Sequence, residues 1–372
     1  MKDVEQRTWE VVRRAFEEER PPVRRSRASN SLLLATVLAG LVTATVAAAA
    51  SPSGRAVLDQ VRRAVGITHA DAALFSLPAP GRLLVVSSEG GGVWLAHDNG
   101  YKRKLGPYED AEWSPHGLYV VATTKNHLVA LDVEHGVRWT LARHDPVWPR
   151  WEGTRTDTRI AYLTRAGLRV VAGDGTGDRL LDRYAGDVPP AWDPGRLHTV
   201  AYYTGGAIVL RNADSGRIVW RAPIDVTPSG LTWSDDGRYL AVTSSPKSVV
   251  LDAGGRLRRS ISMLGAELLE TAFKPGTHLL AVSLRLRQRS QIRLVDVDHP
   301  GRASLLFAGP GDFGDVAWSP NGRWLLLNWP SANQWLFVSG ARVHAVGNIG
   351  QEFPRHDKLG PTLQIAGRWC CS

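Results

Sequence analysis

The sequence predicts an all-β fold: a β-propeller of seven or six four-stranded blades, preceded by a short cytoplasmic helix and one transmembrane helix. From about residue 74 onward, short runs of Val, Leu, Tyr and Trp alternate with clusters of Gly, Asp, Asn and Pro, the pattern of strands and turns. One short text recurs there at intervals of 36 to 45 residues, the period of a four-stranded blade. A separate stretch without charge at 31–50 predicts the membrane span.

The repeat consists of an aromatic residue, a turn rich in Pro and Gly, and an apolar run. We expect the aromatic side chain to end the inner strand of a blade and to fill the wedge between two blades. Pro fixes φ and Gly supplies the positive φ of a tight turn. A first copy begins at Leu77 without an aromatic residue, which leaves six and seven blades both open. The aromatic positions are Trp113, Trp151, Trp192, Trp233, Phe273 and Trp318.

These repeats resemble the blades of WD40-like propellers of the TolB type, which carry the text Trp-Ser-Pro-Asp-Gly that begins almost unchanged at Trp233 and Trp318. The resemblance covers 74–350. It implies a rigid disc with a central channel, whose loop faces bind proteins, peptides or glycans, and it implies no catalysis. The segments ending at Trp139 and Trp220 resemble the docking text of quinoprotein blades, but the adjacent Cys pair lies at the wrong end of the chain for that chemistry.

The twenty residues at 31–50, SLLLATVLAGLVTATVAAAA, form roughly 30 Å of helix, enough to cross a bilayer core. Six Arg residues at 13–30 against three at 51–70 place the N-terminus in the cytoplasm and the propeller outside. A cleaved signal sequence and a buried core helix are the alternatives. We therefore expect a cytoplasmic segment at 1–30, a stalk helix at 51–73, the propeller at 74–350, and a closing strand and tail at 351–372.

Residues 3–20 predict an amphipathic helix that ends before Pro21. Its apolar face carries Trp9, Val12 and Phe16, which a cytoplasmic partner or the membrane surface could cover; a docking helix and a juxtamembrane leader without a binding role are both open. A short cytoplasmic segment, one span and an outer sensor domain also resemble membrane-bound anti-sigma factors. The zinc-binding His and Cys residues of that family are absent from 1–60.

No sequence motif for catalysis, a cofactor or a metal is present. The chain lacks a Gly-x-Ser-x-Gly nucleophile turn and a phosphate-binding loop, and GDGTGD at 173–178 is interpreted as a hairpin turn rather than a calcium loop. The net charge of +9 comes from scattered Arg residues, so we expect no nucleic-acid binding. Cys370 and Cys371 could form a vicinal disulfide, stay as thiols or bridge to a partner, and we expect the vicinal disulfide.

The sequence therefore predicts a single-pass membrane protein with an extracytoplasmic, non-catalytic propeller that binds a protein, peptide or glycan ligand or acts as a scaffold. A signalling regulator that couples an external ligand to a cytoplasmic partner is the second hypothesis. An extracellular propeller enzyme is the third, and it would need a convergent set of His and carboxylate groups that the sequence does not indicate.

Overall fold

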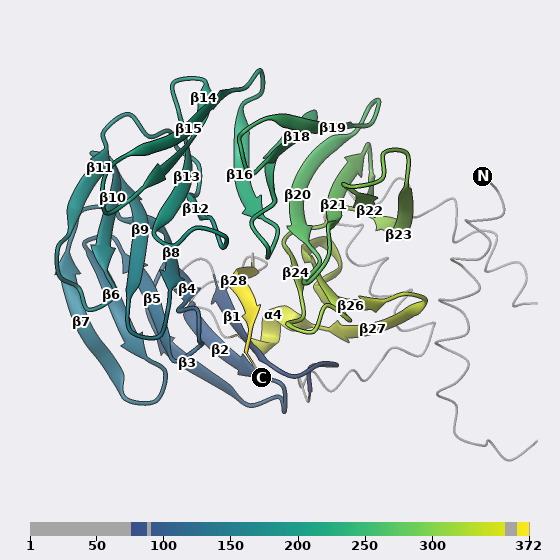
Figure 1. Ribbon diagram of the computed structural model, residues 1–372. Coiled ribbons are helices and arrows are strands. Elements are labelled where there is room, and N and C mark those ends of the chain that lie inside the picture. The colour runs from purple at the N-terminus through teal and green to yellow at the C-terminus, as the bar shows by residue number, and fades with distance from the viewer. Residues whose placement is uncertain (1–75, 88–90, 354–362, 372) are drawn as a thin grey trace, which may run out of the picture. The chain divides into compact units, whose positions relative to one another are not determined.

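The computed structural model describes residues 76–87, 91–353 and 363–371. Within these residues the chain forms seven antiparallel sheets of four strands, and each sheet is one blade (Figure 1). The inner strands of neighbouring blades contact one another in a closed circuit. The predicted all-β propeller of four-stranded blades is confirmed, and the number of blades is seven.

Each blade runs from an inner strand beside the central axis to an outer strand at the rim. Blade 1 contains β28 (Leu363–Cys370), β1 (Arg82–Ser87), β2 (Gly92–His97) and β3 (Lys102–Gly106); blade 2 contains β4 (Asp110–Trp113), β5 (Tyr119–Thr124), β6 (His127–Asp132) and β7 (Gly136–Ala142). Blade 3 contains β8 (Val147–Gly153), β9 (Thr158–Thr164), β10 (Gly167–Ala172) and β11 (Arg179–Asp182); blade 4 contains β12 (Ala191–Trp192), β13 (Thr199–Thr204), β14 (Ala207–Asn212) and β15 (Ile218–Pro223). Blade 5 contains β16 (Pro228–Trp233), β17 (Tyr239–Ser244), β18 (Lys247–Asp252) and β19 (Leu257–Ser262); blade 6 contains β20 (Glu267–Phe273), β21 (Leu279–Leu286), β22 (Arg289–Asp296) and β23 (Ala303–Pro310). Blade 7 contains β24 (Val316–Trp318), β25 (Leu325–Trp329), β26 (Gln334–Ser339) and β27 (Arg342–Gly347), with the short helices η1 (Pro330–Ala332) and α4 (Ile349–Glu352).

The turn between the first two strands of a blade explains the repeated Ser-Pro-x-Gly text. In blade 2 the Ser114 hydroxyl accepts the backbone N–H of Tyr119 at 3.0 Å, while Gly117 adopts φ +65°, which an L side chain rarely tolerates. The hydroxyl groups of Ser234 in blade 5 and Ser319 in blade 7 accept the equivalent backbone N–H at the same distance of 3.0 Å. This turn lies at the same end of each blade as the turn between its third and fourth strands, and we call that end of the propeller the wedge face.

The ring closes through the end of the chain. Strand β28 pairs antiparallel with β1 and becomes the inner strand of blade 1, so that the yellow C-terminal strand lies beside the blue first strand in Figure 1. Gly81, at φ +125°, permits the close approach, because an added Cβ would lie 2.7 Å from the carbonyl oxygen of Cys370. The closing strand expected in 351–372 therefore belongs to the first blade.

One apolar cluster fills each junction between successive blades. Six clusters contain the aromatic residue of the repeat, which ends the inner strand of its blade or lies near that end and packs against the preceding blade. The seventh, between blades 7 and 1, contains Trp369 of β28, packed with Trp335 and Phe337. Trp369 thus takes the place of the aromatic residue that the first sequence copy lacks.

Two further tryptophans join the outer parts of neighbouring blades. The indole N–H of Trp139 in β7 donates to the carbonyl of Gly173 in blade 3 at 2.9 Å, and that of Trp220 in β15 donates to Ala253 in blade 5 at 2.9 Å. Each ring lies over a turn glycine, Gly175 or Gly255. The docking role that the quinoprotein resemblance suggested for these two residues is therefore a structural one.

The N-terminal predictions lie outside the described residues. These are the cytoplasmic helix with Trp9, Val12 and Phe16, the transmembrane helix at 31–50 and the stalk at 51–73. No helix in the part of the chain that the structure describes is long and apolar enough to cross a membrane.

Candidate functional site

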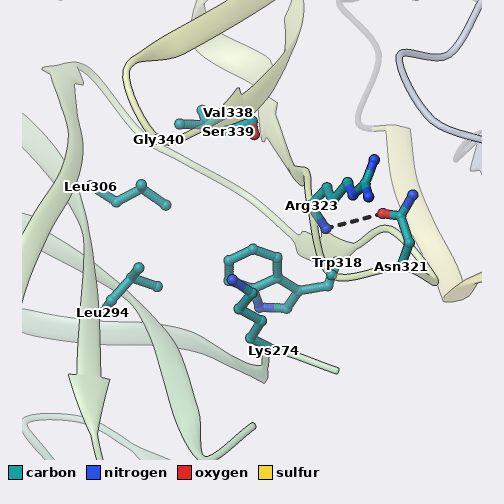
Figure 2. A pocket seen from close by; sticks show the side chains of 10 residues that line it. Lys274, Leu294, Leu306, Trp318, Asn321, Arg323, Val338, Ser339 and Gly340 are labelled. Atoms are coloured by element: carbon teal, nitrogen blue, oxygen red, sulfur yellow. Dashed lines mark hydrogen bonds between the residues drawn. The ribbon is translucent and has the colours of Figure 1, made fainter. Parts of the chain in front are cut away.

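The candidate site is a pocket of about 420 Å³ on the wedge face between blades 6 and 7 (Figure 2). Its volume falls within the range of roughly 300–1,000 Å³ that is common for ligand pockets. Leu294 of β22 and Leu306 of β23 form one wall, and Val338 of β26 forms part of the opposite wall. The inner strand of blade 7 contributes Trp318, the end of β26 contributes Ser339, and the pocket is completed from nearby turns by Lys274, Asn321, Gly322, Arg323 and Gly340.

The pocket exposes the aromatic residue of blade 7. The equivalent residues of the other six blades are only 2% to 9% exposed, whereas Trp318 is partly exposed. Its indole N–H still donates to the carbonyl of Ala272 in blade 6 at 3.2 Å, so the ring is held in place. The site therefore offers a fixed aromatic surface to a ligand.

Two cationic side chains lie at the pocket. The ammonium group of Lys274 lies 5.6 Å from the centre of the Trp318 ring, and Arg323 is exposed in the turn of blade 7. The backbone N–H of Arg323 donates to the side-chain oxygen of Asn321 at 3.0 Å, which fixes this turn (Figure 2). The site thus combines apolar walls with positive charge.

The pocket combines apolar walls and positive charge with few groups that act in acid–base or nucleophilic catalysis. Its ten lining residues include no Asp, Glu, His or Cys, and the side chains among them with a nucleophilic atom are Ser339 and Lys274. The arrangement can bind an apolar group next to an anionic one.

The inner strands bring together a second set of polar residues that the sequence did not reveal. Asp110 and Glu112 come from β4, Arg150 from β8 and Glu270 from β20, and Asp315 immediately precedes β24. A guanidinium nitrogen of Arg150 lies 3.7 Å from a carboxylate oxygen of Glu112. Burial raises the pKa of Asp110, and the positive charge of Arg150 lowers it by a smaller amount, so the pKa stays above its ordinary value. Glu270 is exposed at its surface, but the packed inner strands around it, together with the charge of Asp315, raise its pKa to about 7.

No three His, Cys, Asp or Glu side chains among the described residues are placed so that they could hold a metal ion. The 173–178 segment is a turn between β10 and β11, and Asp178 of that turn accepts hydrogen bonds from Arg143, Arg169 and Tyr162. Burial would raise the pKa of Asp178, but these donors lower it below its usual value. The carboxylate that a calcium ion would need as a ligand is already hydrogen-bonded to the guanidinium groups of Arg143 and Arg169.

Two histidines connect neighbouring blades, and the sequence did not indicate this role. The Nε2 atom of His278 in blade 6 lies 2.9 Å from Asp236 of blade 5, and its Nδ1 atom lies 2.5 Å from Asp298 of blade 6. Burial favours the neutral ring, but the two carboxylates outweigh it and raise the pKa of His278. His198 of blade 4 has a comparable position, with Nδ1 2.6 Å from Asp214 and the backbone N–H bonded to Glu152 of blade 3 at 2.9 Å. These histidines stabilise blade junctions.

The two cysteines lie at the closure of the ring. Cys370 ends β28, and the structure joins its sulfur to that of Cys371. The pair lies against the first turn of blade 2, where a Cβ added to Gly117 would clash with the sulfur of Cys371. Arg82 also contacts this turn, donating to the carbonyl of Gly117 at 2.7 Å.

The sequence supplied only part of the candidate site. Trp318 was identified as a repeat position, but nothing in the sequence indicated that it would be exposed. Lys274 stands where three copies of the repeat have Ser after the aromatic residue, at Ser114, Ser234 and Ser319, and this departure was the one available signal. The apolar walls come from strands that look like those of the other blades.

Comparison with known proteins supports the fold. No family model matches the chain, and no curated protein matches it. Among solved structures, a putative 6-phosphogluconolactonase from Bacteroides uniformis is 15% identical with a TM-score of 0.56, covering 77% of this chain and 99% of that one. The C-terminal WD40 domain of Sif2 is 13% identical with a TM-score of 0.55, covering 70% and 79%. A chain of the mitotic checkpoint complex is 15% identical with a TM-score of 0.54, covering 72% and 90%.

At these identities the likeness shows a β-propeller with WD40 propellers among its structural neighbours, and nothing about activity. The TolB type expected from the repeat text is not distinguished by these neighbours, which include both a putative enzyme and a protein assembly.

Proposed function

We propose that this protein is a non-catalytic binding module whose propeller holds a partner protein at the pocket between blades 6 and 7. The observation that carries the proposal is the chemistry of that pocket. It has apolar walls, a fixed and partly exposed indole and two cations, and its lining residues include no carboxylate, imidazole or thiol group. Such a surface suits the binding of an amphipathic segment better than its chemical conversion.

The WD40 and checkpoint-complex neighbours add support by analogy, because rigid propellers present their loop faces to other proteins. The lactonase neighbour is the reason to test the enzymatic alternative directly. In this chain the carboxylates of the inner strands would be the residues to examine, because Glu270 has a pKa near neutrality.

Site-specific photocrosslinking tests the proposal. A photoreactive amino acid at Asn321, exposed at the edge of the pocket, is expected to give one discrete adduct with another protein in cells that express the full chain. The same label at Ser215, exposed on the wedge face at blade 4, serves as the control. No adduct from Asn321, or the same adducts from both positions, would contradict a binding site at this pocket.

The sequence also supports a membrane-anchored arrangement, which we propose with the N-terminus in the cytoplasm and the propeller outside. Its basis is the uncharged stretch at 31–50 and the excess of Arg before it. Protease added to intact cells is expected to degrade the propeller and to spare a tag at residue 1. A protected propeller would contradict the orientation.

The amphipathic pattern at 3–20 favours a second role, in which the cytoplasmic segment signals to a regulator. Residues 1–30 are expected to recover a specific partner that a double variant, Trp9→Ala with Phe16→Ala, does not recover. Identical recovery by both would argue against signalling through this segment.

A further inference from the structure

One position of the outer strand connects each blade to the next. It is the residue paired with the third-last residue of the blade's third strand, and we call it the strap position. From blade 1 to blade 7 its occupants are Arg103, Trp139, Arg179, Trp220, Arg259, Ser304 and His344.

Four straps donate a side-chain N–H across the junction. Besides Trp139 and Trp220, Arg179 donates to the carbonyl of Ala213 at 2.6 Å, and Arg259 donates to the carbonyl of Asp296. In all four cases the acceptor is the last residue of the next blade's third strand or the residue directly after it. The strap position thus defines a slot that ends at a backbone carbonyl of the following blade.

In blade 6 the strap is missing. Ser304 is exposed, and its short side chain has neither a ring nor a guanidinium group that could reach blade 7. The pocket lies in this same slot: Leu294, which pairs with Ser304, forms one wall, while Ser339 ends the third strand of blade 7 and Gly340 follows it. The pocket is therefore the strap slot between blades 6 and 7. In the described part of the chain it is left open because its strap residue, Ser304, is too short to fill it. This explains why Trp318 is partly exposed while the aromatic residues of the other junctions are buried.

The slot and its surroundings indicate the chemistry of an occupant. Two equivalent slots hold an indole ring with its N–H on a turn carbonyl, so the fold shows which side chain such a slot accepts. Neither Lys274 nor Arg323 forms an ion pair with the described part of the chain, and both therefore favour negative charge beside the ring. We propose that the slot between blades 6 and 7 binds a tryptophan side chain of a partner protein, presented in an acidic segment. This inference rests on the proposed binding function and specifies its ligand.

A short peptide serves as the probe. The full chain in mild detergent is titrated against a fluorescein-labelled peptide of the sequence Glu-Asp-Trp-Asp-Glu, blocked at its C-terminus, and binding is followed by fluorescence anisotropy. We expect saturable binding with a Kd below about 1 mM. Peptides with Ala for Trp, or with Lys for every acidic residue, are expected to bind at least about tenfold more weakly.

Variants of the protein test the slot itself. Ser304→Trp is expected to fill the slot from within, raising the melting temperature and weakening peptide binding by about tenfold or more. Ser260→Trp places the same residue at an exposed outer-strand position of blade 5 and is expected to change neither quantity. Lys274→Glu is expected to weaken binding about fivefold, whereas Arg217→Glu, a charge reversal elsewhere on the wedge face, is not.

The inference is overturned if the acidic tryptophan peptide does not saturate, if the lysine peptide binds equally well, or if the two Trp variants behave alike. Melting of each variant shows that it is folded, so a loss of binding with an unchanged or higher melting temperature supports the slot. An adduct at Asn321 together with any of these overturning results leaves the binding module standing and removes only the tryptophan ligand.

Discussion

The closure of the ring makes a sharp prediction about Trp369, although this residue lies almost at the end of the chain. Its side chain is 3% exposed and packs edge-on against Phe337, with ring centres 5.7 Å apart. Terminal residues normally tolerate substitution, so a large effect would show that the last strand is an integral part of the fold.

The magnitude follows from burial. Truncating a buried Trp to Ala costs about 3–5 kcal/mol, and the edge-on aromatic contact contributes about 0.5–1.5 kcal/mol of its own. With a urea dependence of about 3 kcal/mol per molar, Trp369→Ala should lower the midpoint of unfolding by about 1 M or more. Trp318→Ala should cost less, because its ring is partly exposed already.

The assay is urea unfolding of the full chain in mild detergent, followed by far-ultraviolet circular dichroism. Trp9→Ala is the matched control, since Trp9 lies outside the predicted propeller and should leave the midpoint unchanged. A midpoint for Trp369→Ala within about 0.2 M of the wild type would refute the view that β28 closes the ring.

Three further predictions concern titration and oxidation. The folded-state pKa of His278 is raised, so its stabilisation is complete below the ordinary pKa near 6.5 and is lost as the pH rises through the raised value; His278→Gln should therefore lower the melting temperature more at pH 6 than at pH 9, and an equal loss at both would contradict this. The pKa of Glu270 is raised from 4.5 to about 7, so its ionisation destabilises the fold progressively across that interval; Glu270→Gln should raise the melting temperature above pH 7 and leave it unchanged near pH 4, and no gain at pH 8 would count against a raised pKa at Glu270. If Cys370 and Cys371 are joined to each other, alkylation in denaturant should add no mass without reductant and two groups after reduction, whereas two groups in both samples would show free thiols.

Much of the fold could be predicted because it repeats. The strand-turn-strand pattern occurs in seven copies, and three of them share the same turn, in which Ser accepts the N–H of the next strand and Gly takes the positive φ. Local chemistry of this kind depends on residues close together in the chain, and a sequence displays it directly.

The closing strand illustrates what the repeat could not assign. Trp369 stands about 290 residues from the blade that it completes, and nothing local to it shows that Gly81 and Phe337 are its neighbours. Only the pairing of β28 with β1 gives it a partner, and that pairing depends on the curvature accumulated over all seven blades.

The sequence by itself determined the repeat, the turns, the aromatic residue of six junctions and the lack of any catalytic motif. The tertiary structure alone decided the number of blades, the role of Trp369 and the place of the pocket. The physical reason is that a strap is a contact between two blades. Its absence at Ser304 is visible only when the outer strand of one blade is set beside the turn of the next, which in this ring leaves Trp318 open to a ligand.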